Sequence, residues 1–213
     1  MKKPLVQITK GDIEKALANT VWDLGNQVLY DLCSKYPLHK TPQEILAKVW
    51  LIGRSYAAAL ERRKNKSSDS LGDLFYEDKA APEIKKSKID DWLELLKSDS
   101  TPETAIETHS KLTNLFFKIS KLEKRSLASK YLHFHRQNLF FIYDSMAMSA
   151  IRSVTPGNGQ LPTLVVEESD KEYASFYRRC LWLQNDLEKQ YGYKLSPREL
   201  DKLLLYITDS RKT

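Results

Sequence analysis

The chain has 213 residues, a net charge of +6 and 41% hydrophobic residues, which is enough apolar material for a sizeable core. Its two cysteines, Cys33 and Cys180, lie far apart, which excludes a disulfide framework and a four-cysteine metal site as the organising principle. Free thiols indicate a reducing compartment, so we expect a cytoplasmic protein. No apolar run approaches the roughly 18 residues that a membrane-spanning helix needs.

The positive charge favours an anionic partner such as nucleic acid, a membrane surface or an acidic protein. The same excess of positive charge is explained equally well if it serves only to keep the protein soluble. Composition therefore leaves the choice of partner open.

Helical periodicity dominates the chain, which contains seven glycines. A first helix is predicted over residues 11–35, because apolar residues recur there at steps of three and four. This stripe consists of Ile13, Leu17, Val21, Leu24, Val28 and Leu32. The helix is expected to end at Tyr36, since a residue before proline disfavours the helical conformation.

Thr41-Pro42-Gln43-Glu44 combines a capping box with a proline at the first helical position. It predicts a second helix from there to about Arg63. Similar start signals at residues 101–103, 169–172 and 196–199 each precede another periodic segment.

Three stretches are predicted to be loops: residues 64–70, 80–87 and 155–168. Residues 163–166 could form an extended segment, but no partner strand is evident. We therefore predict an all-α fold with a single helical domain over residues 1–213. Two closely packed helical halves, with the site between them, are the alternative organisation.

The most distinctive stretch spans residues 126–150. A short helix carries Lys130 and His133, and a polar turn and a dense apolar run follow it. A new helix then begins with Asp144 or Ser145 as its N-cap. An N-cap carboxylate accepts hydrogen bonds from free backbone N–H groups, so capping explains Asp144 as well as a chemical role would.

This stretch resembles the helix-hairpin-helix DNA glycosylase superfamily, which includes endonuclease III and the 8-oxoguanine glycosylases. In that family a hairpin leads into a helix carrying a lysine, and an aspartate begins a later helix. Leu127-Ala128-Ser129-Lys130 looks like the step from hairpin to lysine, and Ile142-Tyr143-Asp144-Ser145 looks like the step to the aspartate. The likeness covers about 25 residues. Residues 127–129 contain none of the glycines that let the hairpin backbone of this family approach a DNA phosphate.

The resemblance implies excision of a modified base from double-stranded DNA, without a metal or another cofactor. Asp144 would stabilise the positive charge that develops on the sugar and orient the nucleophile. Lys130 would be that nucleophile and form a Schiff base, which also permits strand cleavage. The alternative for Lys130 is a solvated lysine at a helix start.

Histidines and a second helix supply further candidates. His133 and His135 are two residues apart, so they point to different helix faces and a shared metal is not expected. His133 could share a face with Lys130, although a packed core role explains it equally simply. Arg54, in the second predicted helix, would either pair with a carboxylate such as Glu61 or reach an anion.

A run of cations, Lys118, Lys121, Lys124 and Arg125, leads directly to Lys130 and is the best support for nucleic acid. The cluster at residues 62–66 gives a second basic patch. The predicted catalytic pair is Lys130 and Asp144. The residues predicted to bind DNA or substrate are Arg54, Tyr56, Lys124, Arg125, Ser129 and His133.

Two rival functions stand beside the enzyme. The first is a non-catalytic helical module that binds nucleic acid or a protein. The second is an enzyme for another substrate that uses Arg54, Tyr56 and Glu61.

Overall fold

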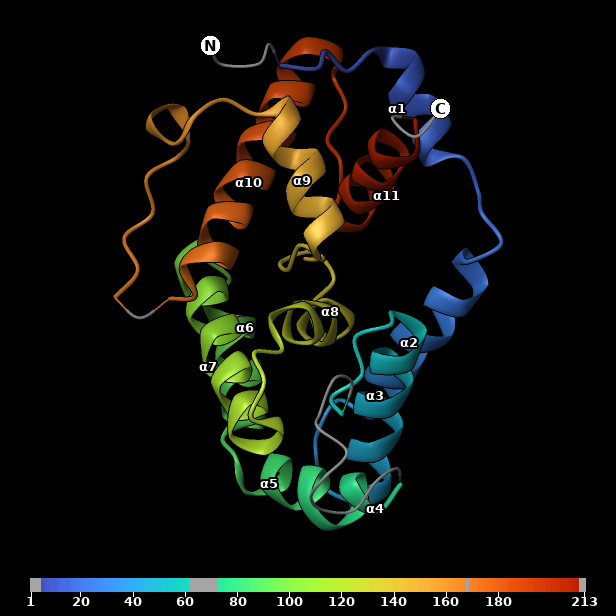
Figure 1. Ribbon diagram of the computed structural model, residues 1–213, viewed down its shortest axis with the longest axis vertical. Coiled ribbons are helices and arrows are strands. Elements are labelled where there is room, and N and C mark those ends of the chain that lie inside the picture. Colours follow the sequence, from blue (N-terminus) through green and yellow to red (C-terminus); the bar gives the residue numbers. More distant parts are fainter. Residues whose placement is uncertain (1–4, 62–72, 168, 211–213) are drawn as a thin grey trace.

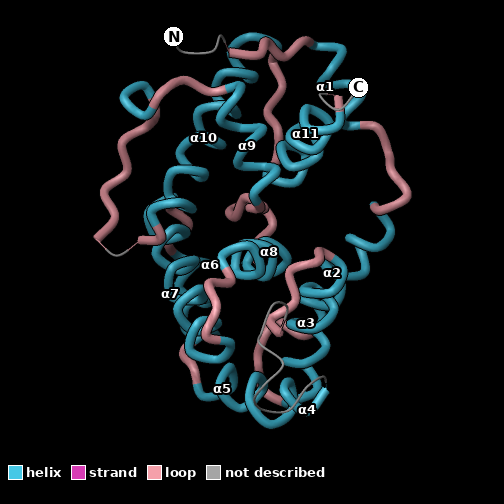
Figure 2. The backbone as a smooth tube through the Cα atoms, viewed as in Figure 1, coloured by secondary structure: helices cyan, strands magenta, loops and turns pink. Residues whose placement is uncertain are grey.

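Helices make up the regular structure throughout residues 5–61, 73–167 and 169–210, which are the residues that the computed structural model describes (Figure 2). The first helices are α1 (Lys10–Leu17), α2 (Asp23–Lys35), α3 (Pro42–Ser55), α4 (Asp73–Phe75), α5 (Ala81–Lys86) and α6 (Ile89–Ser98). They are followed by α7 (Pro102–Ser120), α8 (Arg125–His135), α9 (Ser145–Val154), α10 (Lys171–Tyr191) and α11 (Pro197–Asp209). Within these ranges the fold is all-α and contains no strand, as predicted.

Local capping explains where several helices begin. The Thr41 hydroxyl accepts from the backbone N–H of Glu44, whose carboxylate accepts in return from that of Thr41. Ser196 and Glu199 repeat this capping box at α11. The start signals at these two helices are therefore confirmed.

The prediction of one helix over residues 11–35 was wrong, because α1 ends at Leu17 and α2 begins at Asp23. The Asp23 carboxylate accepts from the backbone N–H of Thr20 at 2.7 Å, and Lys202 of α11 donates to it at 3.1 Å. These contacts hold the chain in a turn. As a result the apolar side chains of Leu24 and Val28 are exposed rather than buried.

The second predicted helix also ends early, at Ser55 instead of about Arg63. Ala57 adopts a left-handed conformation with φ of 49°, and the backbone N–H of Ala58 donates to the Gly53 carbonyl at 2.8 Å. The chain folds back so closely that a Cβ atom on Gly53 would lie 3.0 Å from the Cα of Ala59. The basic cluster at residues 62–66 and the loop at 64–70 lie outside the described residues.

The loop predicted at residues 80–87 is mostly helical. A π-helix over Tyr76–Ala80 runs directly into α5. Pro82 is the second residue of α5. By contrast, residues 155–167 are irregular apart from a 3-10 turn at Asn158–Gln160, as predicted.

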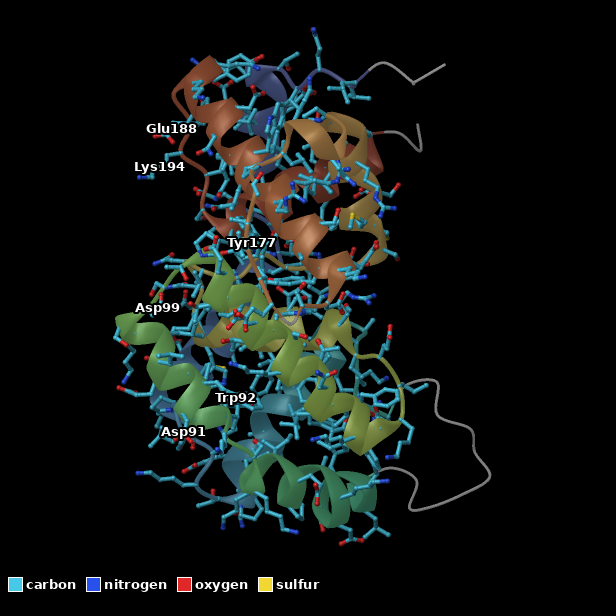
Figure 3. The ribbon with its side chains drawn as sticks, turned by 90° about the vertical axis from the view of Figure 1, so that its left-hand side faces the viewer. Asp91, Trp92, Asp99, Tyr177, Glu188 and Lys194 are labelled. Atoms are coloured by element: carbon cyan, nitrogen blue, oxygen red, sulfur yellow. The ribbon has the colours of Figure 1, made fainter. Side chains whose placement is uncertain are left out.

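Figure 1 shows the helices gathered on either side of α8. On one side α8 packs against α2, α3 and α7, and on the other side α9 packs against α10 and α11. The two sides are joined where α10 meets α7. Tyr177, labelled at this junction in Figure 3, donates its hydroxyl to the Leu139 carbonyl at 2.8 Å.

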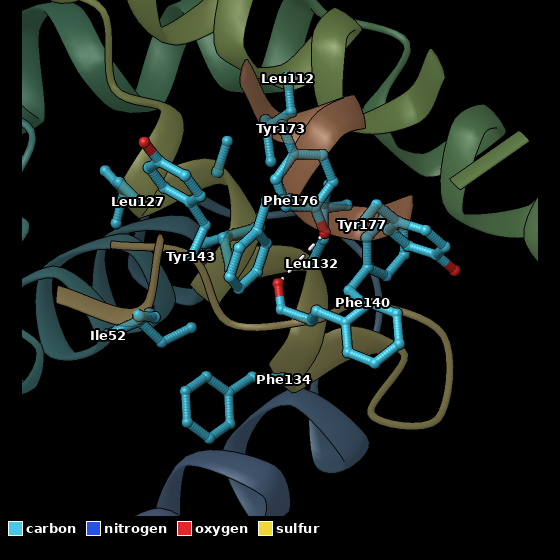
Figure 4. Packing of buried hydrophobic residues seen from close by; sticks show 14 of the residues in the cluster. Ile52, Leu112, Leu127, Leu132, Phe134, Phe140, Tyr143, Tyr173, Phe176 and Tyr177 are labelled. Atoms are coloured by element: carbon cyan, nitrogen blue, oxygen red, sulfur yellow. Dashed lines mark hydrogen bonds between the residues drawn. The ribbon is translucent and has the colours of Figure 1, made fainter. Parts of the chain in front are cut away.

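A continuous cluster of buried side chains runs through the molecule and includes residues of α1 and of α11. Aromatic side chains fill its middle, where Tyr143 packs edge-on against Phe176 (Figure 4). This core surrounds α8 and fixes the position of its side chains. No described helix is long and apolar enough to span a membrane.

Candidate functional site

The amine of Lys130 lies inside the protein, because α8 is enclosed along most of its length. Only 1% of the Lys130 surface is exposed. Its Nζ donates to the Ser126 hydroxyl at 2.7 Å and to the Tyr143 carbonyl at 2.9 Å. The same Nζ lies 5.6 Å from the centre of the Tyr56 ring. These contacts hold the amine in one place.

Asp144 supplies a carboxylate beside this amine. The residue is the N-cap of α9 and has the extended conformation that an N-cap needs. Its Oδ1 accepts from the backbone N–H of Ala147 at 2.8 Å. This bond leaves Oδ2 for Lys130, whose Nζ lies 3.6 Å away. The capping role predicted for Asp144 is confirmed, and the structure brings the two predicted catalytic residues together.

Both side chains line a pocket of about 610 Å³. Its walls come from three segments: the turn after α3, the start of α8 and the start of α9. They comprise residues 56–59, residues 122–127 with Lys130, and residues 143–146. About a third of the Asp144 side chain is exposed, so a ligand in the pocket could reach the carboxylate.

Burial lowers the pKa of Lys130, because removing the amine from water disfavours its charged form. The charges of Asp144 and Asp201 act in the opposite direction. A lysine with a lowered pKa is more often neutral, and a neutral amine is a nucleophile. The pair can therefore combine a nucleophilic amine with a carboxylate that stabilises positive charge.

Two further predicted residues, Lys124 and Arg125, line the same pocket. The Lys124 amine donates to the Ala59 carbonyl at 3.0 Å, which ties the start of α8 to the turn after α3. Arg125 donates to Asp170 at 2.6 Å and stacks over the ring of Tyr143. Both cations thus have partners within the protein and also face the pocket.

Tyr56 and Arg54 lie on the α3 side. Tyr56 lines the pocket, and its hydroxyl donates to the Asn26 side chain at 2.6 Å. Arg54 forms an ion pair with Glu61, one of the two roles expected for it. It does not contribute to the lining of the pocket.

Ser129 and His133 lie behind the pocket. The Ser129 hydroxyl accepts from the backbone N–H of Tyr143 at 3.0 Å, so it fastens the segment before Asp144 to α8. His133 is buried, and its ring nitrogens contact the Tyr30 hydroxyl at 2.6 Å and the Phe140 carbonyl at 2.7 Å. Neither residue is part of the pocket lining.

The hairpin expected at residues 127–129 is not there, because these residues lie inside α8. The turn that joins α7 to α8 comprises residues 121–124 instead. Lys121 takes the left-handed conformation in it, with φ of 60°, in place of a glycine. Lys130 consequently lies in the second turn of its helix.

Sequence reasoning missed several members of the site. Ser126 was detectable, because it precedes Lys130 by four residues and therefore shares its helix face. The Tyr143 carbonyl and the turn at residues 57–59 reach the site through the path of the backbone. Asp201 of α11 lies outside the pocket lining, although its charge acts on Lys130, and no local signal in the sequence relates the two residues.

Comparisons of the chain with protein-family models, with curated proteins and with solved structures find no match. Any function must therefore be argued from the residues of this site.

Proposed function

We propose that this chain binds DNA and acts as a DNA glycosylase with lyase activity, with Lys130 as the nucleophile and Asp144 as the partner carboxylate. The observation that carries the proposal is the buried amine of Lys130, 3.6 Å from Asp144 at the wall of an open pocket. The resemblance of residues 126–150 to the helix-hairpin-helix glycosylases supports the same pair of residues.

In this proposal Lys130 attacks the sugar of a nucleotide whose base has left the helical stack. Its neutral Nζ forms a bond to C1′ while the bond from C1′ to the base breaks. The base departs with the electron pair and takes up a proton. The covalent product rearranges to a Schiff base, from which the neighbouring strand bond can be eliminated.

Asp144 has two tasks in this reaction. Its carboxylate stabilises the positive charge that builds on the sugar as the base departs. It also keeps the amine oriented in the pocket. The capping bond to Ala147 fixes the carboxylate in advance, so no reorganisation is needed at the moment of reaction.

The cations at the start of α8 would hold the DNA backbone. Lys124 and Arg125 line the pocket, and Lys118 and Lys121 are exposed nearby along the chain. Such contacts release counterions, so we expect DNA affinity to fall steeply as salt rises.

A second candidate function follows from the hydrogen bonds of Lys130. Its amine is already bonded to Ser126 and Tyr143 and faces Asp144, which is how a lysine that ties two helices together would look. On this hypothesis the chain is a helical module that binds nucleic acid or a protein without chemistry. Lys130 and its partners would then contribute only to the stability of the fold.

Borohydride trapping separates the two functions, because it reduces a Schiff base to a stable link between protein and DNA. The substrates are duplex oligonucleotides with an abasic site or one of a panel of single modified bases. We expect a trapped adduct with the unaltered protein and none with Lys130→Ala. Asp144→Asn should lower the yield by roughly 100-fold or more, the size typical of losing a charge-stabilising group.

Lys189→Ala is the matched control, since it removes the same charge from an exposed position near the end of α10. It should trap like the unaltered protein. Absence of an adduct on every substrate, with salt-sensitive DNA binding retained in both site variants, would instead establish the non-catalytic module.

A further inference from the structure

Ser126 contacts both the buried Lys130 amine and the pocket. It is the second residue of α8 and precedes Lys130 by four positions, so the two side chains share a helix face. Its Oγ accepts a hydrogen bond from Lys130 Nζ at 2.7 Å. Ser126 is half-buried and belongs to the pocket lining, whereas only 1% of the Lys130 surface is exposed. The serine therefore offers the enclosed amine a polar route towards the pocket.

Three oxygen atoms of the described residues surround this amine, and they differ in what they can do with a proton. They are Ser126 Oγ at 2.7 Å, the Tyr143 carbonyl at 2.9 Å and Asp144 Oδ2 at 3.6 Å. A backbone carbonyl accepts hydrogen bonds but has no proton of its own to pass on. A protonated Asp144 would lose the negative charge that the proposed reaction needs. A hydroxyl can accept one proton while it releases another, so it stays neutral.

The Ser126 hydroxyl also has a proton to release. Within the described part of the chain, Ser126 Oγ accepts from Lys130 and donates to no protein group. Ser129 differs, because its hydroxyl donates to the Ser126 carbonyl at 3.0 Å and accepts from the backbone N–H of Tyr143 at 3.0 Å. The hydroxyl of Ser129 is thus engaged by the backbone, whereas that of Ser126 can donate to solvent that enters the pocket.

We propose that Ser126 is a catalytic residue whose hydroxyl carries away the proton that the Lys130 nitrogen loses during Schiff base formation. For the DNA reaction this inference rests on the proposed function. Once the nitrogen has bonded to C1′ and the base has left, the nitrogen carries two protons and a positive charge. One proton passes to Ser126 Oγ, whose own proton leaves to solvent. The electron pair on the nitrogen then forms the C=N bond as the bond from C1′ to the ring oxygen breaks, and that oxygen takes up a proton.

Three variants test this role. Ser126→Ala removes the hydroxyl and should keep the helix, because alanine is the better helix former. Ser126→Thr keeps a hydroxyl at the same position. Ser34→Ala is the matched control, since it removes a hydroxyl from an exposed position in α2.

The first measurement uses formaldehyde in place of DNA. Formaldehyde forms a Schiff base with a lysine amine, whose nitrogen must again lose a proton, and cyanoborohydride reduces the product to methylated lysine. Peptide mass spectrometry follows the rate at Lys130, at a pH where the rate no longer rises with pH. We expect Ser126→Ala to react roughly 100-fold more slowly, the lower end of what general acid–base catalysis contributes. Ser126→Thr and Ser34→Ala should react like the unaltered protein.

Added imidazole distinguishes a proton relay from a purely structural role. Without the hydroxyl, an external base that enters the pocket can take the proton instead. At constant pH the rate of Ser126→Ala should therefore rise with imidazole concentration, whereas that of the unaltered protein should not. A slow variant that imidazole does not accelerate would overturn the proposal, because the hydroxyl would then only hold the amine in place. Equal rates in Ser126→Ala and the unaltered protein would overturn it as well.

Borohydride trapping on a duplex with an abasic site separates failure of this inference from failure of the proposed function. If both hold, Ser126→Ala is slow and is rescued by imidazole with formaldehyde and with DNA alike. The same effects with formaldehyde, but no trapping of the unaltered protein on any duplex, would reject the glycosylase and retain the proton relay at Lys130. Trapping that is equally fast in Ser126→Ala and the unaltered protein would reject the relay alone.

Discussion

At the scale of single residues, Asp144 has two separable roles. Its Oδ1 caps α9 and its Oδ2 faces Lys130. Asparagine keeps an acceptor for the cap and removes the charge, whereas alanine removes both. A comparison of the two variants therefore measures each role on its own.

We predict that Asp144→Ala is less stable than Asp144→Asn by about 1 kcal/mol, the usual value of an N-cap. Urea unfolding followed by circular dichroism measures the free energies. Equal losses in the two variants would show that the cap contributes nothing here. Both variants should lose trapping, because both lack the carboxylate.

The pairing of Lys130 with Asp144 was predicted from the resemblance of residues 126–150 to the helix-hairpin-helix glycosylases, and their local sequence alone indicated a cap and a helix-start lysine. The residues of distant segments that act on this pair were not predicted. Asp201 lies in a periodic segment in which a carboxylate three residues after Arg198 looks like an ordinary surface pair. The burial of Asp201 depends on how α11 packs against α9, and this packing cannot be predicted from the local sequence.

At the scale of helices, starts were predicted better than ends. A helix start at Thr41 or Ser196 is encoded by four adjacent residues, because the side chains of the first and the fourth accept hydrogen bonds from each other's backbone N–H groups. The break before α2 depends on a contact with a distant segment, between Asp23 and Lys202, and the turn that ends α3 is tied to the start of α8 by Lys124. Such tertiary contacts override helical periodicity.

Gly53 shows why the end of α3 is shaped as it is. Alanine in a helix is normally more stable than glycine by up to about 1 kcal/mol. Here its Cβ would meet the backbone of Ala59 at 3.0 Å. We predict that Gly53→Ala destabilises the protein by about 1 kcal/mol or more, because backbone has little room to move.

Gly25→Ala is the control, since a Cβ at Gly25 in α2 meets nothing within 4 Å. That variant should be as stable as the unaltered protein or more stable, and thermal unfolding compares the two. Stabilisation by Gly53→Ala would contradict the close approach of the turn, and with it this wall of the pocket.

At the scale of the whole molecule, buried histidines make stability depend on pH. Burial lowers the pKa of His109 and of His133 to about 4, well below the value near 6.5 of an unfolded chain. As the pH falls below 6.5, the unfolded chain takes up protons before the folded protein does. Stability that is fully present above pH 6.5 is therefore lost as the pH approaches 4.

We predict that the free energy of unfolding falls between pH 6.5 and pH 4.5, by about 1 kcal/mol per pH unit for each of these histidines. Asp201 acts in the opposite direction, because its raised pKa favours the folded state as the pH falls from 6 to 4. Because the two histidines together outweigh the single carboxyl group, the free energy of unfolding falls overall as the pH is lowered. Urea unfolding at a series of pH values measures it, and constant stability over this range would contradict the buried, neutral rings.

Peptide mass spectrometry of a borohydride-trapped adduct would show whether Lys130 is the proposed nucleophile. After digestion of the protein and of the DNA, we expect a deoxyribose remnant on the peptide that contains Lys130. A remnant on another lysine, or no remnant with any duplex of the panel, would contradict it.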